Sequence, residues 1–457
     1  MKEVETTIDE YPATSDPNVA PSNVSNDPEG STLETLKPSA WDNKLAVVVT
    51  WFTFLMFGLS DGTTGALLPS IQKDYNVSYT VVSLIFFCQI LGYGILGLGS
   101  TYVLSRVGRL WGVLAGGALF MMGLAILTAN TPHFAGIVLG YILLGFAAGF
   151  FESILNAFFG SFRESNVILG CLHGFYGLGA AVAPISVTQW IAAGLPWYRW
   201  YAVLLGLAGF MTTMIAIAFR KHSIAYCAAE DALASKRHTD LTAEDTPRRQ
   251  KTPVMAALTN KFCLVGAFYM FCYLAMEIST GGFVLTFLTN VRGASEPVAG
   301  YANTGFWLGL TLGRFLLTPA ANIVGAWLGC QLFTAMSLFC ILGFWLAPTY
   351  VGSSIGIALT GFFLGPTFPL IIQLATDYLP PRLHVAGIGL IASIGSMGGA
   401  IFPLVVGVIA TSRGPKAIPP ILVALLVALL AVWMMLPGPK LVQLTELTKR
   451  ALRKHSG

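Results

Sequence analysis

Apolar runs long enough to form membrane-spanning helices fill most of this 457-residue chain. A helix that crosses the hydrocarbon core needs about 20 mostly apolar residues, and its backbone groups must be satisfied internally because no water is present there. We predict six such helices on each side of a polar stretch: 45–69, 79–103, 110–129, 134–160, 167–191 and 199–219, then 262–289, 300–318, 325–346, 353–376, 385–410 and 418–436. The prediction is therefore an all-α integral membrane protein with 12 transmembrane helices.

The composition excludes an ordinary soluble protein, because 55% of the residues are hydrophobic and only 11% are charged. The first residues are rich in Pro, Ser, Asn, Asp and Glu and cannot bury a core, so we expect them to be disordered. The expected organisation is a cytoplasmic tail, a six-helix bundle, a cytoplasmic central loop, a second six-helix bundle and a second cytoplasmic tail: 1–44, 45–219, 220–261, 262–436 and 437–457.

Basic residues are concentrated in the loops of one side, which predicts that both termini are cytoplasmic. If the N-terminus is inside, the central loop alone carries eight Lys and Arg residues, while the outer loops together hold only Lys73, Arg199, Arg292, Arg413 and Lys416. We expect a monomer in the plasma membrane rather than in a vacuolar or other internal membrane.

The two halves of the chain repeat short Gly-rich and Pro-rich patterns at nearly one spacing. Residues 176–184 (YGLGAAVAP) parallel 395–403 (GSMGGAIFP), and Val107-Gly108 parallels Val324-Gly325. Together with the six-plus-six arrangement, these matches predict two parallel repeats related by an axis along the membrane normal.

Three acidic residues, Asp61, Glu152 and Glu277, lie within apolar segments that contain no Lys or Arg of their own. A charge at mid-bilayer costs between ~2.5 kcal/mol and more than 10, depending on the method, so such residues usually line a substrate or ion path. Without a cationic partner in sight, each is expected to meet water, bind a cation or carry a proton. This pattern favours a coupled transporter.

Glu152 has the most suggestive surroundings, because Asn156 follows it by four residues and shares its helix face. We expect the carboxylate and the amide to point into one cavity. The alternative is a Glu–Asn hydrogen bond that joins two helices.

The other two acids lie near residues that disturb helices. Gly281 and Gly282 follow Glu277 and are expected to loosen its helix, as in the broken helices of transporters. Asp61 lies about two turns before Pro69, which we expect to end the helix. A purely structural Glu277 and a packing role for Asp61 remain alternatives.

Two motifs combine Gly with Arg. Arg106-Val-Gly-Arg109 follows the second span, and Gly309-Leu-Thr-Leu-Gly313-Arg314 closes the eighth. Small residues four apart let helix backbones approach closely, and Arg314 is expected at the cytoplasmic edge. The alternative is that these Arg residues are ordinary anchors flanking a span.

These patterns together resemble one transporter family. The Arg106-x-Gly-Arg109 loop is similar to the major facilitator signature, with Ser105 in place of its usual acid. The sequence resembles fungal-type members of the fucose–proton symporter family of the major facilitator superfamily in four places: Glu152-x-x-x-Asn156, Tyr273-x-x-x-Glu277, the Gly-rich eighth span ending in Gly313-Arg314, and Gly398-Gly-Ala-Ile-x-Pro403.

The resemblance implies the major facilitator fold and roles in sugar recognition and proton coupling for a span-one Asp and the span-four Glu. Glu152 matches that Glu directly. Asp61 lies about one turn before the family's Asp.

Further residues are candidates for substrate contacts. Asn303, Phe306 and Trp307 share one helix face, which would suit a sugar ring or another small, partly apolar molecule. These aromatic side chains could instead pack against lipid or neighbouring helices.

Two more polar pairs are weaker candidates for the same cavity. His173 and Tyr176 are one turn apart, and His173 could relay protons, although a hydrogen-bonded helix histidine is an equal alternative. Gln89 and Gln373 lie in the second and tenth predicted spans.

Asn76-Val-Ser78 is a glycosylation sequon in a short predicted outer loop. The chain carries no nucleotide-binding loop, and its seven cysteines lack metal-ligand spacing, so no cofactor or metal is expected.

The leading hypothesis is a secondary active transporter that moves a small organic solute, sugar-like by resemblance, by alternating access and driven by a proton gradient. Its expected partners are that solute and the lipid bilayer, with no nucleic acid. The alternatives are an exporter of a drug-like or secondary metabolite and a non-transporting membrane sensor of solute. An enzyme is disfavoured because no His/Asp, Ser/His or metal-ligand cluster appears.

Overall fold

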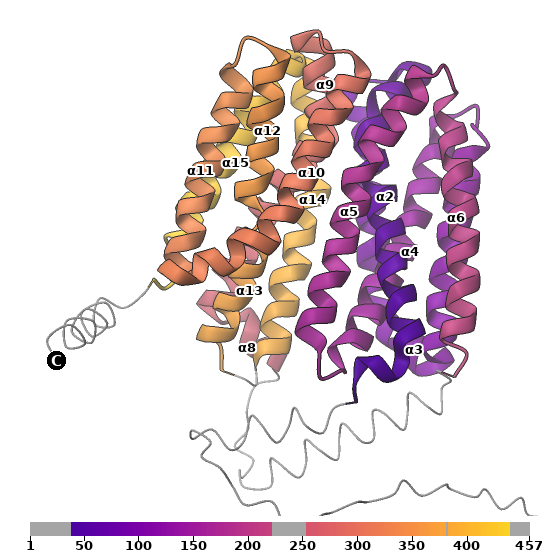
Figure 1. Cartoon of the computed structure of the whole chain (residues 1–457), viewed down its shortest axis with the longest axis vertical. Coiled ribbons are helices and arrows are strands. Elements are labelled where there is room, and N and C mark those ends of the chain that lie inside the picture. Colours follow the sequence, from indigo (N-terminus) through magenta and orange to yellow (C-terminus); the bar gives the residue numbers. More distant parts are fainter. Residues whose placement is uncertain (1–37, 222–252, 381–382, 439–457) are drawn as a thin grey trace, which may run out of the picture.

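The computed structural model describes residues 38–221, 253–380 and 383–438, and it is helical throughout (Figure 1). The first half contains η1 (Ala40–Asn43), α2 (Lys44–Asp74), α3 (Tyr79–Thr128), α4 (Phe134–Gly160), α5 (Ser165–Ala192) and α6 (Trp197–Ala218). The second half contains α8 (Pro253–Leu258), α9 (Lys261–Arg292), α10 (Glu296–Val324), α11 (Ala326–Leu346), α12 (Tyr350–Leu364), α13 (Thr367–Tyr378), α14 (His384–Arg413), η3 (Pro415–Ala417) and α15 (Ile418–Trp433).

Within the described ranges, eleven helical stretches are long and apolar enough to cross a membrane. The 29-residue α10 is as long as these but more polar, since it carries Asn303 and Arg314. With α10 included, the structure has the twelve spans that the sequence predicts.

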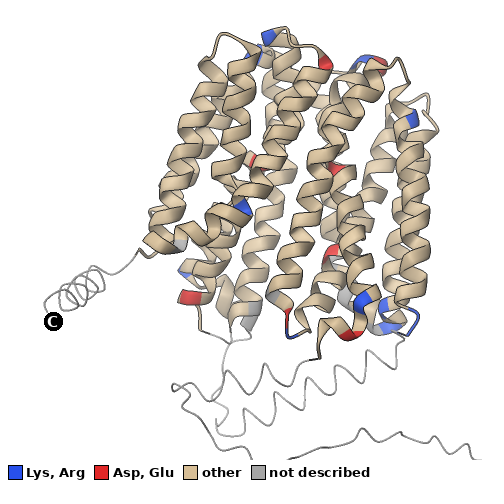
Figure 2. Cartoon of the chain, viewed as in Figure 1, with Lys and Arg blue, Asp and Glu red and all other residues tan. Residues whose placement is uncertain are grey.

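Helices α2–α6 form one bundle and α8–α15 form a second bundle beside it (Figure 1). We call the end at which α2 begins and α6 finishes the lower end, and the opposite one the upper end. Most charged residues lie at these two ends, and only a few lie within the thickness of the bundles (Figure 2). This distribution is expected when the middle of the molecule faces hydrocarbon.

Several helix boundaries differ from the sequence prediction. Pro69 lies inside α2 and does not end it, so α2 runs five residues beyond the predicted limit. The predicted tenth span is split into α12 and α13 at Gly365-Pro366, because a proline lacks the N–H that would continue the ladder. The expected tail 1–44 overlaps η1 and Lys44, and the predicted central loop includes the short α8. Residues 1–37 and 439–457 of the two predicted tails, and residues 222–252 of the predicted central loop, lie outside the described residues.

Backbone turns with positive φ recur in the two halves at a nearly constant spacing. Gly108 (φ 77°) bends α3 between two spans, and Gly325 (φ 94°) lies 217 positions later between α10 and α11. The pairs Asn76 and Gly293, and Gly194 and Gly414, have the same property at offsets of 217 and 220. A positive φ is strained for most residues but not for glycine. Its recurrence at matching positions of the two halves supports the duplication inferred from sequence.

The duplicated motif of the fifth and eleventh spans packs in the same way in each half. A Cβ on Gly179 of α5 would lie 2.1 Å from the carbonyl oxygen of Leu55 in α2. A Cβ on Gly398 of α14 would lie 1.9 Å from the carbonyl oxygen of Phe271 in α9. Both glycines therefore allow two helix backbones to touch, as small residues do in membrane bundles.

Several hydrogen bonds join the two bundles towards the upper end. The hydroxyls of Thr80 and Thr411 are 3.0 Å apart, and the amide of Gln189 donates to the Tyr301 hydroxyl over 2.6 Å. Thr304 donates to the carbonyl of Ala181 over 2.8 Å. These contacts close the upper side of the interface between the bundles.

The segment before α2 is fastened to the α4–α5 turn at the lower end. The backbone N–H of Ala40 and the Ser39 hydroxyl donate to the two carboxylate oxygens of Glu164, over 2.9 and 3.0 Å. Chiefly because of the Ala40 N–H, the pKa of Glu164 is held below its usual value. Ala40 itself is fully buried, so η1 has a defined position.

Candidate substrate site between the two bundles

A small cavity lies between the bundles at mid-height, with a volume of about 60 Å³. Helices α2, α3, α9 and α10 all contribute to its wall, which includes Asp61, Gly65, Phe86, Gln89, Ile278 and Trp307. The wall is mostly apolar with a few polar groups, as is usual for small-molecule sites. The volume would hold on the order of four water molecules.

Asp61 is the charged residue of this cavity, and neutral donors from two other helices hold it. The Gln89 amide of α3 donates to Oδ1 over 2.7 Å, and the Tyr176 hydroxyl of α5 donates to Oδ2 over 2.9 Å. Three sequence candidates from three spans therefore form one cluster. Hydrogen bonds to a carboxylate stabilise it, but neither donor neutralises its charge.

Trp307 forms the opposite wall, on the side of the second bundle. A Cβ on Gly281 of α9 would lie 2.5 Å from its ring, so only a glycine admits this indole. The Trp307 Nε1 is buried and has no hydrogen-bond partner among the described residues. Among the described residues it is thus a buried donor left unpaired, in a side chain that lines the cavity.

Asn303 lies one turn before Trp307 and is completely buried. Its amide donates to the Gly281 carbonyl over 3.0 Å, while its Oδ1 is unpartnered among the described residues. The helix α9 is continuous across Gly281 and Gly282, so the expected loosening there is wrong. The glycine pair instead makes room for the Trp307 ring of α10 and the Phe86 ring of α3.

Glu277 has a cationic partner, contrary to the sequence expectation. Arg314 Nη2 lies 3.0 Å from Oε2 and 3.2 Å from Oε1 of Glu277, and it also donates to the Tyr273 hydroxyl over 2.9 Å. The placement of Arg314 at the cytoplasmic edge is wrong, because α10 continues ten residues beyond it to Val324. Glu277 is only 3% exposed, so its charge depends on this pairing rather than on water.

Glu152 and Asn156 interact as the spacing predicts, but within one helix. The Asn156 amide donates to the Glu152 carboxylate over 2.6 Å and to its backbone carbonyl over 2.8 Å. The Asn156 amide therefore bonds within α4 and not between two helices, as the alternative had proposed. Glu152 is not part of the wall of the 60 Å³ cavity.

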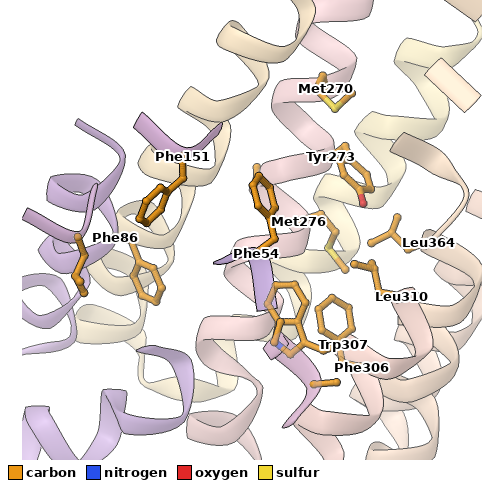
Figure 3. Packing of buried hydrophobic residues seen from close by; sticks show 14 of the residues in the cluster. Phe54, Phe86, Phe151, Met270, Tyr273, Met276, Phe306, Trp307, Leu310 and Leu364 are labelled. Carbon is orange, nitrogen blue, oxygen red and sulfur yellow. The ribbon is translucent and has the colours of Figure 1, made fainter. Parts of the chain in front are cut away.

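The remaining substrate candidates His173, Phe306 and Gln373 are not part of the cavity wall. The His173 ring lies between those of Phe54 and Phe368, with centroids 6.1 and 6.4 Å away. Phe306 is completely buried and packs against α12 at Gly361. Figure 3 shows it in the packed interior with Leu310 of the same helix. Gln373 is half-buried in α13.

The glycines of the eighth span pack as predicted. A Cβ on Gly309 would lie 2.4 Å from the Ala358 carbonyl oxygen, and one on Gly313 would lie 1.9 Å from that of Phe362. Both positions bring α10 against α12. This close packing carries Arg314 into the interior of the second bundle.

The loop arginines and the sequon occupy the ends of the molecule. Arg106 is exposed, with its guanidinium 5.2 Å from the Tyr102 ring centroid. Arg109 is buried, and its guanidinium lies 4.8 Å from the Phe158 ring centroid. Asn76 is exposed at a positive-φ turn (φ 49°) of the upper end.

Sequence reasoning missed the apolar residues of the cavity wall and the partner of Glu277. Phe86 and Ile278 resemble any other apolar residue of a span, so no sequence signal distinguishes them. Arg314 did carry a signal, because it lies inside the predicted 300–318 segment. An Arg in one apolar segment and a Glu in the preceding one suggest an ion pair.

The sequence profile of the Major Facilitator Superfamily matches residues 50–280 and 267–455. The solved structure of a bacterial homologue of the human lysosomal transporter Spinster, inward-facing and unoccupied, has a TM-score of 0.61 to this chain at 11% identity. The alignment covers 86% of this chain and 94% of the chain in the solved structure. This likeness supports the fold.

Two curated relatives cover most of the chain. "Bypass of stop codon protein 6" of Saccharomyces cerevisiae is 28% identical over 415 residues, covering 86% of this chain and 82% of the relative. The "Glucose/galactose transporter" of Brucella abortus is 26% identical over 409 residues, covering 85% and 93%. The profile match spans both bundles, so the chain belongs to the Major Facilitator Superfamily, whose members are transporters rather than enzymes.

Proposed function

We propose that this secondary transporter imports a neutral, sugar-like solute together with a proton, and that the solute binds at the cavity between Asp61 and Trp307. The observation that carries the proposal is the pairing of a carboxylate on one bundle with an indole N–H on the other, where the part of the chain that the structure describes supplies neither a cation for the first nor an acceptor for the second. A ligand that both donates and accepts hydrogen bonds could bridge the two groups, and sugar hydroxyls do both.

The chemistry of the wall fits a polyol better than a wholly apolar molecule. Asp61 accepts hydrogen bonds, Gln89 offers an amide beside it, and the Trp307 indole offers an apolar ring face and a donor. The Trp side chain combines an apolar ring with an N–H group that can donate a hydrogen bond. Such a site could pack against the C–H face of a sugar and bind its hydroxyls.

Asp61 is the best candidate for the proton carrier. Its hydrogen-bond partners Gln89 and Tyr176 are neutral, so protonation removes a half-buried charge that no cation among the described residues neutralises. Glu277 is less suited, because its charge is balanced by Arg314. Glu152 with Asn156 remains a second candidate, by resemblance to the fucose–proton symporter family.

The size of the cavity supports alternating access. A volume of about 60 Å³ is far below the roughly 300 Å³ at which ligand pockets usually begin. A hexose therefore needs the bundles to separate. The hydrogen bonds at the upper end, including that between Gln189 and Tyr301, are the ones that must break for opening on that side.

Two further parts of the proposal rest on the sequence and the relatives. The distribution of basic residues supports a cytoplasmic lower end with both termini inside, and we place the protein in the plasma membrane. The Brucella relative named as a glucose/galactose transporter supports a hexose as the substrate class and membership of the fucose–proton symporter family.

Proteoliposomes with an imposed pH gradient test the proposal. The wild type is expected to accumulate a labelled hexose in response to the gradient. Asp61→Asn is expected to lose this accumulation and to retain counterflow exchange, because exchange needs no net proton movement. Asp74→Asn, in the same helix but at the upper end, is the matched control and should accumulate hexose normally.

Full gradient-driven accumulation by Asp61→Asn would exclude Asp61 as the proton carrier. Absence of counterflow with every hexose and pentose would exclude a sugar as the substrate. In that case, gradient-driven extrusion of apolar dyes would favour the exporter.

A further inference from the structure

A second cavity, of about 240 Å³, lies at the lower end of the first bundle. Its wall is formed by η1 and the first turn of α2 on one side and by the last turn of α6 with the residues that follow it on the other. Figure 1 shows the start of α2 and the finish of α6 at this same end. The cavity is separate from the substrate site and shares no residue with it.

Cations dominate the wall of this second cavity. Lys44, Arg220 and Lys221 contribute to it from two segments far apart in sequence, against the single carboxylate of Asp42. All four residues are exposed, so their side chains can reach a ligand. The positive excess favours an anionic ligand.

Apolar residues lie beside these cations on the outer surface of the bundle. Leu45 of α2 and Ile217 of α6 line the cavity and are 50% and 46% exposed. Both belong to helices that cross the membrane. A molecule with an anionic head and an apolar body would therefore find matching surfaces at adjacent residues.

The position of the cavity wall is fixed by contacts already described. Ser39 and Ala40, which precede the wall residues, bond to Glu164. Scattered cations at a helix end would be explained by membrane orientation alone. A formed cavity between two helices, with three cations around it, is a more specific arrangement, since basic pockets of this kind bind lipid head groups.

We propose that this cavity binds the head group of an anionic glycerophospholipid, with Lys44, Arg220 and Lys221 around the phosphate and Leu45 and Ile217 along the acyl chains. The lipid would link η1 and α2 to α6. Since α2 also carries Asp61, an occupied cavity would hold the lower part of that helix in place. The proposal does not depend on the identity of the transported solute.

Binding of short-chain lipids to the purified full-length protein in detergent tests this directly. Dioctanoyl phosphatidylserine and dioctanoyl phosphatidylinositol phosphate are expected to bind and to raise the melting temperature, whereas dioctanoyl phosphatidylcholine is not. Arg220→Gln/Lys221→Gln should weaken anionic-lipid binding roughly 30-fold, as expected for the loss of two cations near an anionic group. Arg163→Gln/Lys261→Gln removes two exposed cations elsewhere in the described structure and should bind normally.

A second variant checks the cavity without changing charge. Ala218→Phe fills the space between the two walls and should abolish lipid binding while the lipid-free melting temperature stays within a few degrees of the wild type. Equal weakening in the control double variant would overturn the proposal, because charge alone would then explain binding. Inositol phosphate without acyl chains binding as tightly as the lipid would also overturn it, in favour of a soluble anion.

Discussion

Replacing Arg314 with Gln would leave the buried carboxylate of Glu277 without its cation, and we predict a loss of about 3–5 kcal/mol in the free energy of unfolding. The side chains are 17% and 4% exposed, so water can compensate only a little. At 3.0 Å and an effective dielectric constant near 20, the direct attraction is about 5.5 kcal/mol. The neutral Tyr273 hydroxyl cannot replace that charge.

A double-mutant cycle isolates the interaction. Glu277→Gln should also destabilise the protein, because it leaves Arg314 as an uncompensated buried cation. The double variant Glu277→Gln/Arg314→Gln restores neutrality and keeps groups that can hydrogen-bond. We therefore expect it to be more stable than either single variant, with a coupling energy of about 2–3 kcal/mol.

Equilibrium unfolding in mixed micelles, followed by far-ultraviolet circular dichroism, gives the required free energies. Arg413→Gln, an exposed arginine at the upper end, is the control and should cost less than about 0.5 kcal/mol. Strictly additive effects of the two single variants, or losses below about 1 kcal/mol for each, would refute the reasoning. The pair would then be solvated rather than buried.

Three further predictions address packing, the site and the lower end. Gly313→Ala places a Cβ against a backbone carbonyl and should cost about 1–3 kcal/mol in unfolding free energy, whereas Gly343→Ala, which meets open space, should be neutral or slightly stabilising. Gln89→Leu removes a donor 2.7 Å from the cavity carboxylate and should weaken substrate affinity roughly tenfold in counterflow assays; unchanged affinity would exclude Gln89 from the site. The Ala40 N–H lowers the pKa of Glu164, so the stabilisation is present above the unfolded value of about 4.3 and is lost as pH falls through the folded value. The difference in melting temperature between the wild type and Glu164→Gln should therefore shrink as the pH falls below about 4.3 and vanish once the pH is below the lowered folded pKa of Glu164. A pH-independent difference would contradict this account.

The number of spans followed from the sequence because hydropathy is a local property. Each apolar run must become a helix in lipid, whatever its neighbours are. Helix ends were less predictable. Pro69 stays inside α2, whereas the tenth span divides at Gly365-Pro366, so the presence of a proline does not by itself fix a helix end.

The ranking of the three acids changed once the packing was known. From the sequence, Glu152 had the strongest support, because Asn156 and a family pattern coincide there. In the structure, Asp61 lines the cavity between the bundles, and donors from α3 and α5 converge on it. Convergence of side chains from distant spans cannot be derived from spacing within one span.

The sequence by itself determined that this chain spans a membrane, predicted that its halves are duplicated, and showed that acidic residues within the spans need an explanation. These conclusions depend on composition, length and repeated turns, which are encoded locally. Only the tertiary structure decided how each acid is compensated. Glu277 meets Arg314 of the next helix, Glu152 meets an amide of its own helix, and Asp61 meets neutral donors beside a cavity. The cost of a buried charge depends on which groups lie within about 3 Å of it, and helix packing alone brings those groups together.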